Sequence, residues 1–197
     1  MRDYFANSAL QWLEEFRLDG FRMDATDYMN TGAQKSSSTP HYAKTGSTPA
    51  GKLTRKKNLT EIMAAHGVPY VATASAGHLA DLTRKVAKAK AMRGTRILTL
   101  LIPCLDGRGV DDDMGLAAAR LAVESGAFPL VEVEDGVRYT VNAAKSRPIG
   151  DYLAIQRRYR HMTAELVAAL QAEIDLGWAR LQQRAAAPCT DAPQIAM

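Results

Sequence analysis

Three short stretches of the sequence carry residue types that could do chemistry. D-G-F-R-M-D sets Arg22 beside the carboxylate of Asp24, Y-M-N-T-G ends in an amide, a hydroxyl and a glycine, and P-C places Cys104 directly after an apolar run. The chemistry open to such groups is carboxylate catalysis, cation binding through oxygen, and metal or redox chemistry of a thiolate. Each has a plain alternative, because Asn and Gly favour turns and a thiol after a strand can simply fill space.

Length and charge limit what can position these groups. The chain has 197 residues, enough for one domain but too few for a catalytic barrel of about 250 residues. The net charge of +4 is small, so it does not imply nucleic-acid binding. We interpret the basic residues of the expected helix at 78–92 as a solvated face, with attraction of an anionic ligand or acidic partner as the alternative; they are Arg84, Lys85, Lys88, Lys90 and Arg93.

The cysteines and apolar runs indicate a cytoplasmic location. Cys104 and Cys189 lie in different kinds of sequence, which argues against a structural disulfide. The N-terminus lacks a signal-peptide pattern, and the longest apolar run, I-L-T-L-L-I-P-C-L, is too short to cross a bilayer. We expect no membrane association.

Strands and helices alternate after a long loop. An amphipathic helix is expected at 4–16 and a loop at 30–57, followed by a short helix that ends at Gly67. Three apolar strands, V-P-Y-V-A-T-A, R-I-L-T-L-L-I-P and F-P-L-V-E-V-E-D, are separated by helices at 78–92 and 114–124. A hairpin through Asp135 and Gly136 and two closing helices complete the pattern. This order predicts an α/β fold with a mainly parallel sheet flanked by helices.

From Tyr28 onward the sequence resembles a known enzyme subunit. Blocks such as Y-M-N-T-G-A-Q-K-S-S-S-T-P, L-A-V-E-S-G-A-F-P-L-V-E-V-E-D-G and P-I-G-D-Y-L-A-I-Q-R-R-Y-R-H occur in the order found in β subunits of the 2-oxoacid:ferredoxin oxidoreductase family, which includes pyruvate:ferredoxin oxidoreductase. The resemblance implies a partial thiamine diphosphate-binding fold in which Mg²⁺ ties the cofactor's pyrophosphate to the protein. In this resemblance Asn30 supplies an amide ligand, Thr31 and Gly32 continue the cofactor loop, and Asp27 offers a backbone carbonyl, although Ala25 stands where the family has Thr or Asn.

The same resemblance makes Cys104 a candidate ligand of a [4Fe-4S] cluster. Such a cluster needs four thiolates as a rule, and the family's N-terminal C-x-x-C, its further Cys and its G-D-G segment have no counterpart in this chain. An inert buried thiol is therefore the alternative for Cys104.

The first 29 residues resemble something different. The stretch R-D-Y-F-A-N-S-A-L-Q-W-L-E-E-F-R-L-D-G-F-R-M-D is similar to α-amylase superfamily enzymes, close to glucan branching enzymes. In this resemblance Asp24 would be the nucleophile. A retaining glycosidase also needs a second carboxylic acid, which the family takes from a later barrel strand, and no barrel pattern follows here. We expect three parts: the amylase-like segment 1–29, a truncated thiamine-type domain at 30–184 and a disordered tail at 185–197.

The whole pattern leaves three interpretations. The first is a β-subunit-like part of an enzyme that oxidatively decarboxylates a 2-oxoacid to acyl-CoA, completed by α-, γ- and δ-like subunits and ferredoxin, and oligomeric. The second is a chimeric fragment that acts as a catalytically dead binding or scaffold module. The third is an α-amylase superfamily fragment.

Overall fold

The computed structural model describes residues 41–44, 52–53, 55 and 58–187. The helix expected at 4–16 and most of the loop at 30–57 lie outside this part of the chain. The described elements are α3 (Leu59–Ala65), β1 (Tyr70–Ser75), α4 (Leu79–Ala91), β2 (Arg96–Leu101), α5 (Leu105–Arg108), η1 (Asp112–Met114), α6 (Gly115–Glu124), β3 (Val131–Glu134), β4 (Arg138–Val141), α7 (Ile149–Ala154), η2 (Arg157–Tyr159) and α8 (Ala164–Ala186).

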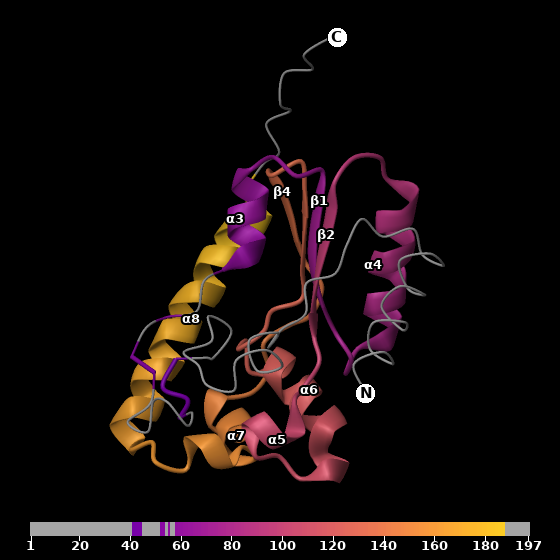
Figure 1. The fold of residues 1–197 in the computed structure, drawn as a ribbon. Helices are drawn as coiled ribbons and strands as arrows, with labels where there is room; N and C mark the ends of the chain where they lie inside the picture. The colour runs from indigo at the N-terminus through magenta and orange to yellow at the C-terminus, as the bar shows by residue number, and fades with distance from the viewer. Residues whose placement is uncertain (1–40, 45–51, 54, 56–57, 188–197) are drawn as a thin grey trace.

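The four strands form one mixed sheet in the order β2-β1-β3-β4. The three strands expected from apolar runs are all present, and the α/β class is confirmed. β1 and β2 are parallel, whereas β3 runs antiparallel to β1 and β4 antiparallel to β3. The chain leaves β2 and builds α5, η1 and α6 at the same end of the sheet (Figure 1), so β3 starts there and runs back. A parallel β3 would need a crossover to the other end, which apolar content alone does not encode.

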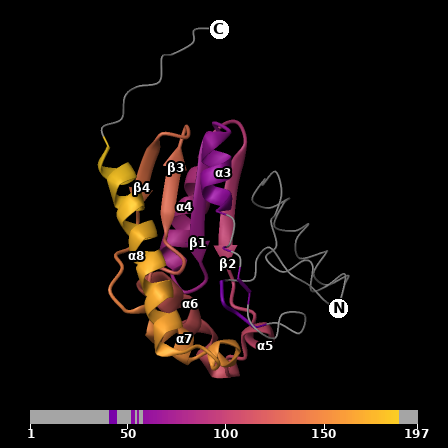
Figure 2. The same ribbon diagram turned by 90° about the vertical axis from the view of Figure 1, so that its left-hand side faces the viewer.

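Helices cover both faces of the sheet. α4 lies on one face, and α3 and α8 lie on the other, as the two ribbon views agree (Figures 1 and 2). Because side chains alternate along a strand, Tyr70 and Ala72 point to α4, where they pack with Ala89. Val71, Val131 and Val133 point to the opposite face and pack with Ala64 of α3.

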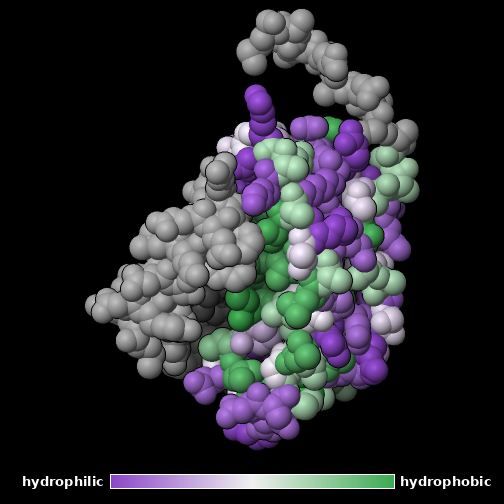
Figure 3. Space-filling model, turned by 90° about the vertical axis from the view of Figure 1, so that its right-hand side faces the viewer, coloured by the Kyte–Doolittle hydropathy of each residue, from purple (hydrophilic) through white to green (hydrophobic). Residues whose placement is uncertain are grey.

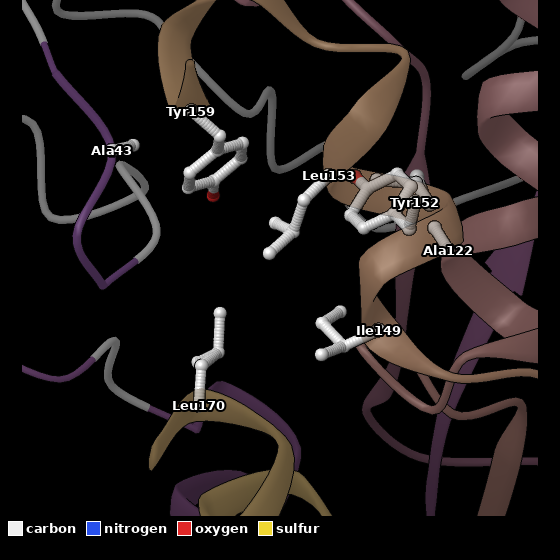
Figure 4. Packing of buried hydrophobic residues seen from close by; sticks show 8 residues of the cluster. Ala43, Ala122, Ile149, Tyr152, Leu153, Tyr159 and Leu170 are labelled. Carbon is white, nitrogen blue, oxygen red and sulfur yellow. The ribbon is translucent and has the colours of Figure 1, made fainter. Parts of the chain in front are cut away.

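A third core cluster closes the end of the molecule at which β1 and β2 finish. Ile149, Tyr152 and Leu153 of α7 converge there on Leu170 of α8 and Tyr159 of η2 (Figure 4). Leu170 of α8 is buried in this cluster, and α8 packs on β4 and α7. α8 ends at Ala186, two residues beyond the expected limit of the domain.

Local signals in the sequence set most element ends. The Asn58 side chain caps α3 by accepting a hydrogen bond from the Glu61 amide, and Thr163 caps α8 in the same way. Gly67 and Gly126, after α3 and α6, have positive φ angles, as expected for glycines that end helices. None of the helices that the structure describes combines the length and apolar character needed to span a membrane.

The β3–β4 hairpin turns on two residues with left-handed backbones. Asp135 has φ +52° and Gly136 φ +74°, and the Val137 amide donates to the Glu134 carbonyl across the turn. This is the primed turn that Asp-Gly favours. A Cβ at Gly136 would lie 2.5 Å from the Ala64 carbonyl oxygen of α3, so the turn also seats the hairpin against that helix.

We expect Gly136→Ala to lower the free energy of unfolding by about 1–3 kcal/mol, because alanine is strained at this φ and clashes with α3. Urea denaturation followed by circular dichroism measures the change. The matched control is Gly177→Ala in α8, where a Cβ meets nothing within 4 Å; it should stabilise the chain by about 0.5–1 kcal/mol. Equal effects of the two substitutions would contradict the role of this turn.

Candidate functional site

The residues expected to bind thiamine diphosphate and Mg²⁺ are Asp27, Asn30, Thr31 and Gly32, and all of them lie outside the described part of the chain. Their assignment stays a prediction. The amylase-like Arg22 and Asp24 lie outside it too. Of the expected site residues, only Cys104 can be placed.

Cys104 lies at the end of the sheet where the parallel strands finish. It is the N-cap residue of α5, three residues after the last residue of β2, and its side chain is exposed and not in a disulfide. The alternative of a buried thiol is therefore wrong, because β2 ends at Leu101 and the chain is already exposed at Ile102. Gly107 allows the next turn to approach the thiol, since a Cβ there would lie 3.2 Å from Sγ.

Among the described residues, Cys104 has no neighbouring side chains that could complete a metal cluster with it. No group of three or more His, Cys, Asp or Glu side chains that could hold a metal occurs in residues 41–44, 52–53, 55 and 58–187. A [4Fe-4S] cluster takes four thiolates as a rule, so this part of the chain does not fit the cluster by itself.

The loop after β1 meets Cys104 at the same edge. The Ala76 amide donates to the Leu101 carbonyl at 3.2 Å, which ties the two strand ends together. The buried Ser75 hydroxyl accepts from the Gly77 amide at 3.2 Å and fixes the turn into α4. A Cβ at Gly77 would lie 2.9 Å from the Arg120 amide nitrogen, so only glycine lets this turn press on α6. Ligands of α/β proteins bind at such carboxyl edges, which makes this edge the candidate functional site.

A buried ionic cluster holds α4 in place beside this edge. Glu132 of β3 is 1% exposed and accepts four hydrogen bonds. The donors are Arg84 Nη1 at 2.6 Å, Tyr70 Oη at 2.8 Å, Lys88 Nζ at 3.0 Å and Asn142 Nδ2 at 3.0 Å. The cluster therefore joins β1, β3, the loop after β4 and α4.

Lys85 extends the cluster toward the strand β1. Its side chain is 0% exposed, and Nζ donates to the Thr73 carbonyl and to Asp81 Oδ2, both at 2.7 Å. Burial lowers the pKa of Lys85, and Asp81 opposes this shift by favouring the charged form. A buried ammonium needs such partners because an unpaired charge is costly in the interior.

The pKa values of the cluster show which protonation states it stabilises. Burial alone would raise the pKa of Glu132, but hydrogen bonds from Arg84, Lys88 and Tyr70 lower it to about 2. Burial and the bond to Glu132 raise the pKa of Tyr70, so the phenol keeps its proton. The cluster is thus a carboxylate held by protonated donors, which positions α4 and does not transfer protons near neutral pH.

The prediction of a solvated face on α4 is wrong for Lys85, and Arg84 and Lys88 are only partly exposed. Arg84 and Lys88 reach over the sheet to Glu132, and Lys85 is buried, whereas Lys90 and Arg93 are not buried. Sequence reasoning missed Glu132 and Glu134 as their partners. The signal was the V-E-V-E alternation of β3, which places both carboxylates on the face that α4 covers.

An open groove between the end of β4 and α8 is lined by few side chains that could bind or catalyse. It has a volume of about 560 Å³ and lies between the segment after β4 and the last turns of α8. Lys145, its only charged lining residue, forms an ion pair with Asp175. Trp178 and several alanines supply most of the remaining wall, so the groove is not the candidate site.

No protein-family model matches the chain. The chain is 47% identical over 158 residues to the pyruvate synthase subunit PorB of Methanocaldococcus jannaschii, covering 77% of this chain and 53% of that protein. It is 40% identical over 171 residues to the ketoisovalerate oxidoreductase subunit VorB of Pyrococcus horikoshii, covering 82% and 55%. For the PorB subunit of Thermotoga maritima the identity is 39% over 169 residues, covering 80% and 52%.

The chain is similar to subunits of enzymes named for 2-oxoacids. Pyruvate and ketoisovalerate are both 2-oxoacids, so the names agree on the class of compound. The chain spans about half the length of the curated relatives that it matches. These names support the oxidoreductase resemblance and give no support to the α-amylase resemblance of residues 1–29.

We expect Glu132→Gln to lower the free energy of unfolding at pH 7 by about 3–5 kcal/mol, because it leaves Arg84 and Lys88 without their shared carboxylate. The folded-state pKa of Glu132, about 2, lies below the ordinary 4.5. Its contribution is therefore present above pH 4.5 and is lost as the pH falls toward 2. Urea denaturation of both proteins should show their stabilities converging over that pH range.

The control for this prediction is Asp112→Asn. Asp112 is an exposed carboxylate in η1, outside the cluster. Its substitution should change stability little at any pH. A Glu132→Gln protein as stable as the wild type at pH 7 would contradict the structural role of the cluster.

Proposed function

We propose that the chain is a β-subunit-like part of a thiamine diphosphate-dependent 2-oxoacid:ferredoxin oxidoreductase. In this proposal it works with other chains in the oxidative decarboxylation of a 2-oxoacid such as pyruvate to acyl-CoA. The observation that carries the proposal is the 47% identity over 158 residues to a pyruvate synthase subunit. The α/β fold, with its parallel strand pair ending at one edge, suits a cofactor site of this kind.

The described residues contribute positioning to this function. Ser75 and Gly77 fix the turn after β1, and Cys104 presents an exposed thiol from the neighbouring strand end. In the proposal Cys104 is one thiolate ligand of a [4Fe-4S] cluster whose other ligands come from outside the described residues. Asn30, Thr31, Gly32 and Asp27 would face the pyrophosphate and Mg²⁺. When bound, thiamine diphosphate supplies the electron sink for decarboxylation.

Partner subunits follow from the same proposal. The relatives are named as subunits and are about twice as long as the matched part. At the candidate edge Leu79, Ile102 and Leu116 are each more than half exposed, and the side of the molecule that carries α4 shows a band of hydrophobic residues (Figure 3). Exposed apolar surface of this kind marks sites of association. We propose α-, γ- and δ-like subunits and ferredoxin as partners, and an oligomeric assembly; the cytoplasmic location stays a prediction.

A second candidate function is a binding or scaffold module without catalysis. The observation that favours it is that Cys104 lacks metal-binding neighbours in the described part of the chain. A scaffold of this kind would have the same partners, but we would expect no cofactor chemistry even when they are present.

We expect the purified chain alone to show no pyruvate- and coenzyme A-dependent reduction of a viologen dye, and weak thiamine diphosphate binding at most by isothermal titration with Mg²⁺. The chain lacks the family's G-D-G segment and the other cysteines, so metal and cluster would each miss most of their ligands. Anaerobic reconstitution with iron and sulfide should leave no cluster absorbance, in the wild type and in Cys104→Ser alike.

Co-expression with the other subunits of the Methanocaldococcus jannaschii enzyme, and with the half of its PorB that this chain does not match, separates the two candidates. The oxidoreductase proposal expects a stable complex in which dye reduction depends on Cys104 and Asn30. A stable complex without dye reduction favours the scaffold. The absence of any complex would contradict both, and dye reduction by the lone chain would show a more complete site than proposed.

A further inference from the structure

Two arginines lie inside the end of the molecule where α5, α7 and η2 meet. Arg108, the last residue of α5, is 8% exposed, and its Nη1 donates to the Tyr152 hydroxyl at 2.5 Å. Arg158 of η2 donates from Nε to Gln156 Oε1 at 3.1 Å, and its guanidinium lies 5.0 Å from the Tyr159 ring centroid. Gln156 in turn donates to the backbone carbonyl of Tyr152 at 2.7 Å, so both arginines are held by hydrogen bonds that involve Tyr152 and Gln156.

Among the residues that the structure describes, neither arginine has a carboxylate partner. Every polar group that bonds to them in the described part of the chain is neutral. The neighbouring acids are engaged elsewhere, since Asp111 pairs with Arg157 and Asp151 with Arg147. Arg158 Nη2 is buried and has no hydrogen-bond partner within the described part of the chain. This contrasts with α4, where the buried Lys85 has Asp81 beside it and the partly exposed Arg84 and Lys88 pair with Glu132.

The pKa of Arg158 reflects this excess of positive charge. Burial lowers the pKa of Arg158, and the nearby charge of Arg108 lowers it further. A buried cation without a counter-charge is costly, and each additional like charge raises the cost. An anion placed between the two guanidinium groups would remove both penalties.

The backbone holds the two arginines at a fixed separation. Gly109 follows Arg108 with φ +61°, and its carbonyl accepts from the Arg157 amide at 3.1 Å. A Cβ at Gly109 would lie 2.7 Å from Arg157 Cβ, so the two segments touch through glycine. On the other side the Lys44 amide donates to the Arg158 carbonyl at 3.4 Å. The cationic groups are therefore preorganised, which lowers the cost of binding a ligand.

We propose that Arg108 and Arg158 form an oxyanion-binding site for a small ligand of the carboxylate or phosphate type. Guanidinium groups match these anions because their planar N–H groups can donate to two oxygens at once. The unpartnered Nη2 of Arg158 supplies the free donor, and the Tyr152 hydroxyl can turn to a bound oxygen. The site uses neither Cys104 nor residues 27–32, so it does not depend on the proposed function.

Thermal unfolding in anion series at matched ionic strength tests the proposal. For the wild-type chain, phosphate, acetate or both should raise Tm progressively above the value in chloride, because a ligand of the folded state stabilises it by mass action. The phosphate and acetate arms show which anion the site takes, and titration calorimetry with the effective anion gives its Kd. Equal Tm values in all three salts, with no heat of binding, would overturn the site.

Arg158→Met is the decisive variant, since it keeps the length of the side chain and removes the charge. It should weaken anion binding about tenfold or more, because a charge-assisted hydrogen bond is lost. In chloride its Tm should be equal to or above that of the wild type, because an unpaired charge is gone. If it does not fold by circular dichroism, Arg108→Met is measured in its place with the same expectation for binding.

Arg160→Gln is the matched control. Arg160 follows η2 directly, is exposed and carries the same charge. It should bind the anion as the wild type does. If Arg160→Gln and Arg158→Met lose the anion effect equally, that effect reflects overall charge and the proposed site is wrong.

Discussion

The burial of Glu132 is the constraint on which the rest of the structure depends. A carboxylate that is 1% exposed inside a four-stranded sheet requires several donors at once, and they come from β1, α4 and the segment after β4. Satisfying it fixes the rotation of α4, because Arg84 and Lys88 must both face the sheet while Lys85 points at the Thr73 carbonyl. Apolar packing alone is less demanding: Ala72, Ala89 and their neighbours would tolerate a slide of the helix that this ionic cluster does not.

The fixed position of α4 reaches the candidate site through one turn. The N-terminus of α4 follows Ser75, Gly77 and His78, so holding the helix also holds the loop at the carboxyl end of β1. This loop is bonded to the end of β2, which leads into Cys104. The cluster and the edge therefore form one mechanical unit, although no residue of the cluster belongs to the edge. Such an arrangement suits a site that needs a rigid wall whose remaining ligands come from another polypeptide.

Much of this fold could be predicted from the sequence, because its signals are local. Gly67, Gly126 and the Asp135-Gly136 pair mark ends and turns through backbone conformation, and the apolar runs mark the strands. The direction of β3 could not be predicted, since it depends on the end of the sheet at which α6 finishes and β3 begins. The partners of the basic residues on α4 could not be predicted either: Arg84 and Glu132 lie 48 residues apart, and only the sheet brings them together. For the site, the position of Cys104 after a strand was predictable, but its exposure depends on where β2 ends and α5 begins.

The cations of α4 and the arginine pair Arg108 and Arg158 obey the same electrostatics and lead to opposite conclusions. On α4, Arg84, Lys85 and Lys88 form ion pairs with Asp81, Glu132 and Glu134, so acids of the same chain compensate their charge. Where α5, α7 and η2 meet, the described side chains that bond to Arg108 and Arg158 are neutral, and they include Tyr152 and Gln156; backbone hydrogen bonds tie these segments together. A fold that supplies acids to one buried group of cations has no physical obstacle to supplying them to another. Because none of the described residues supplies an acid to this pair of arginines, their uncompensated charge supports the proposed binding of an anion.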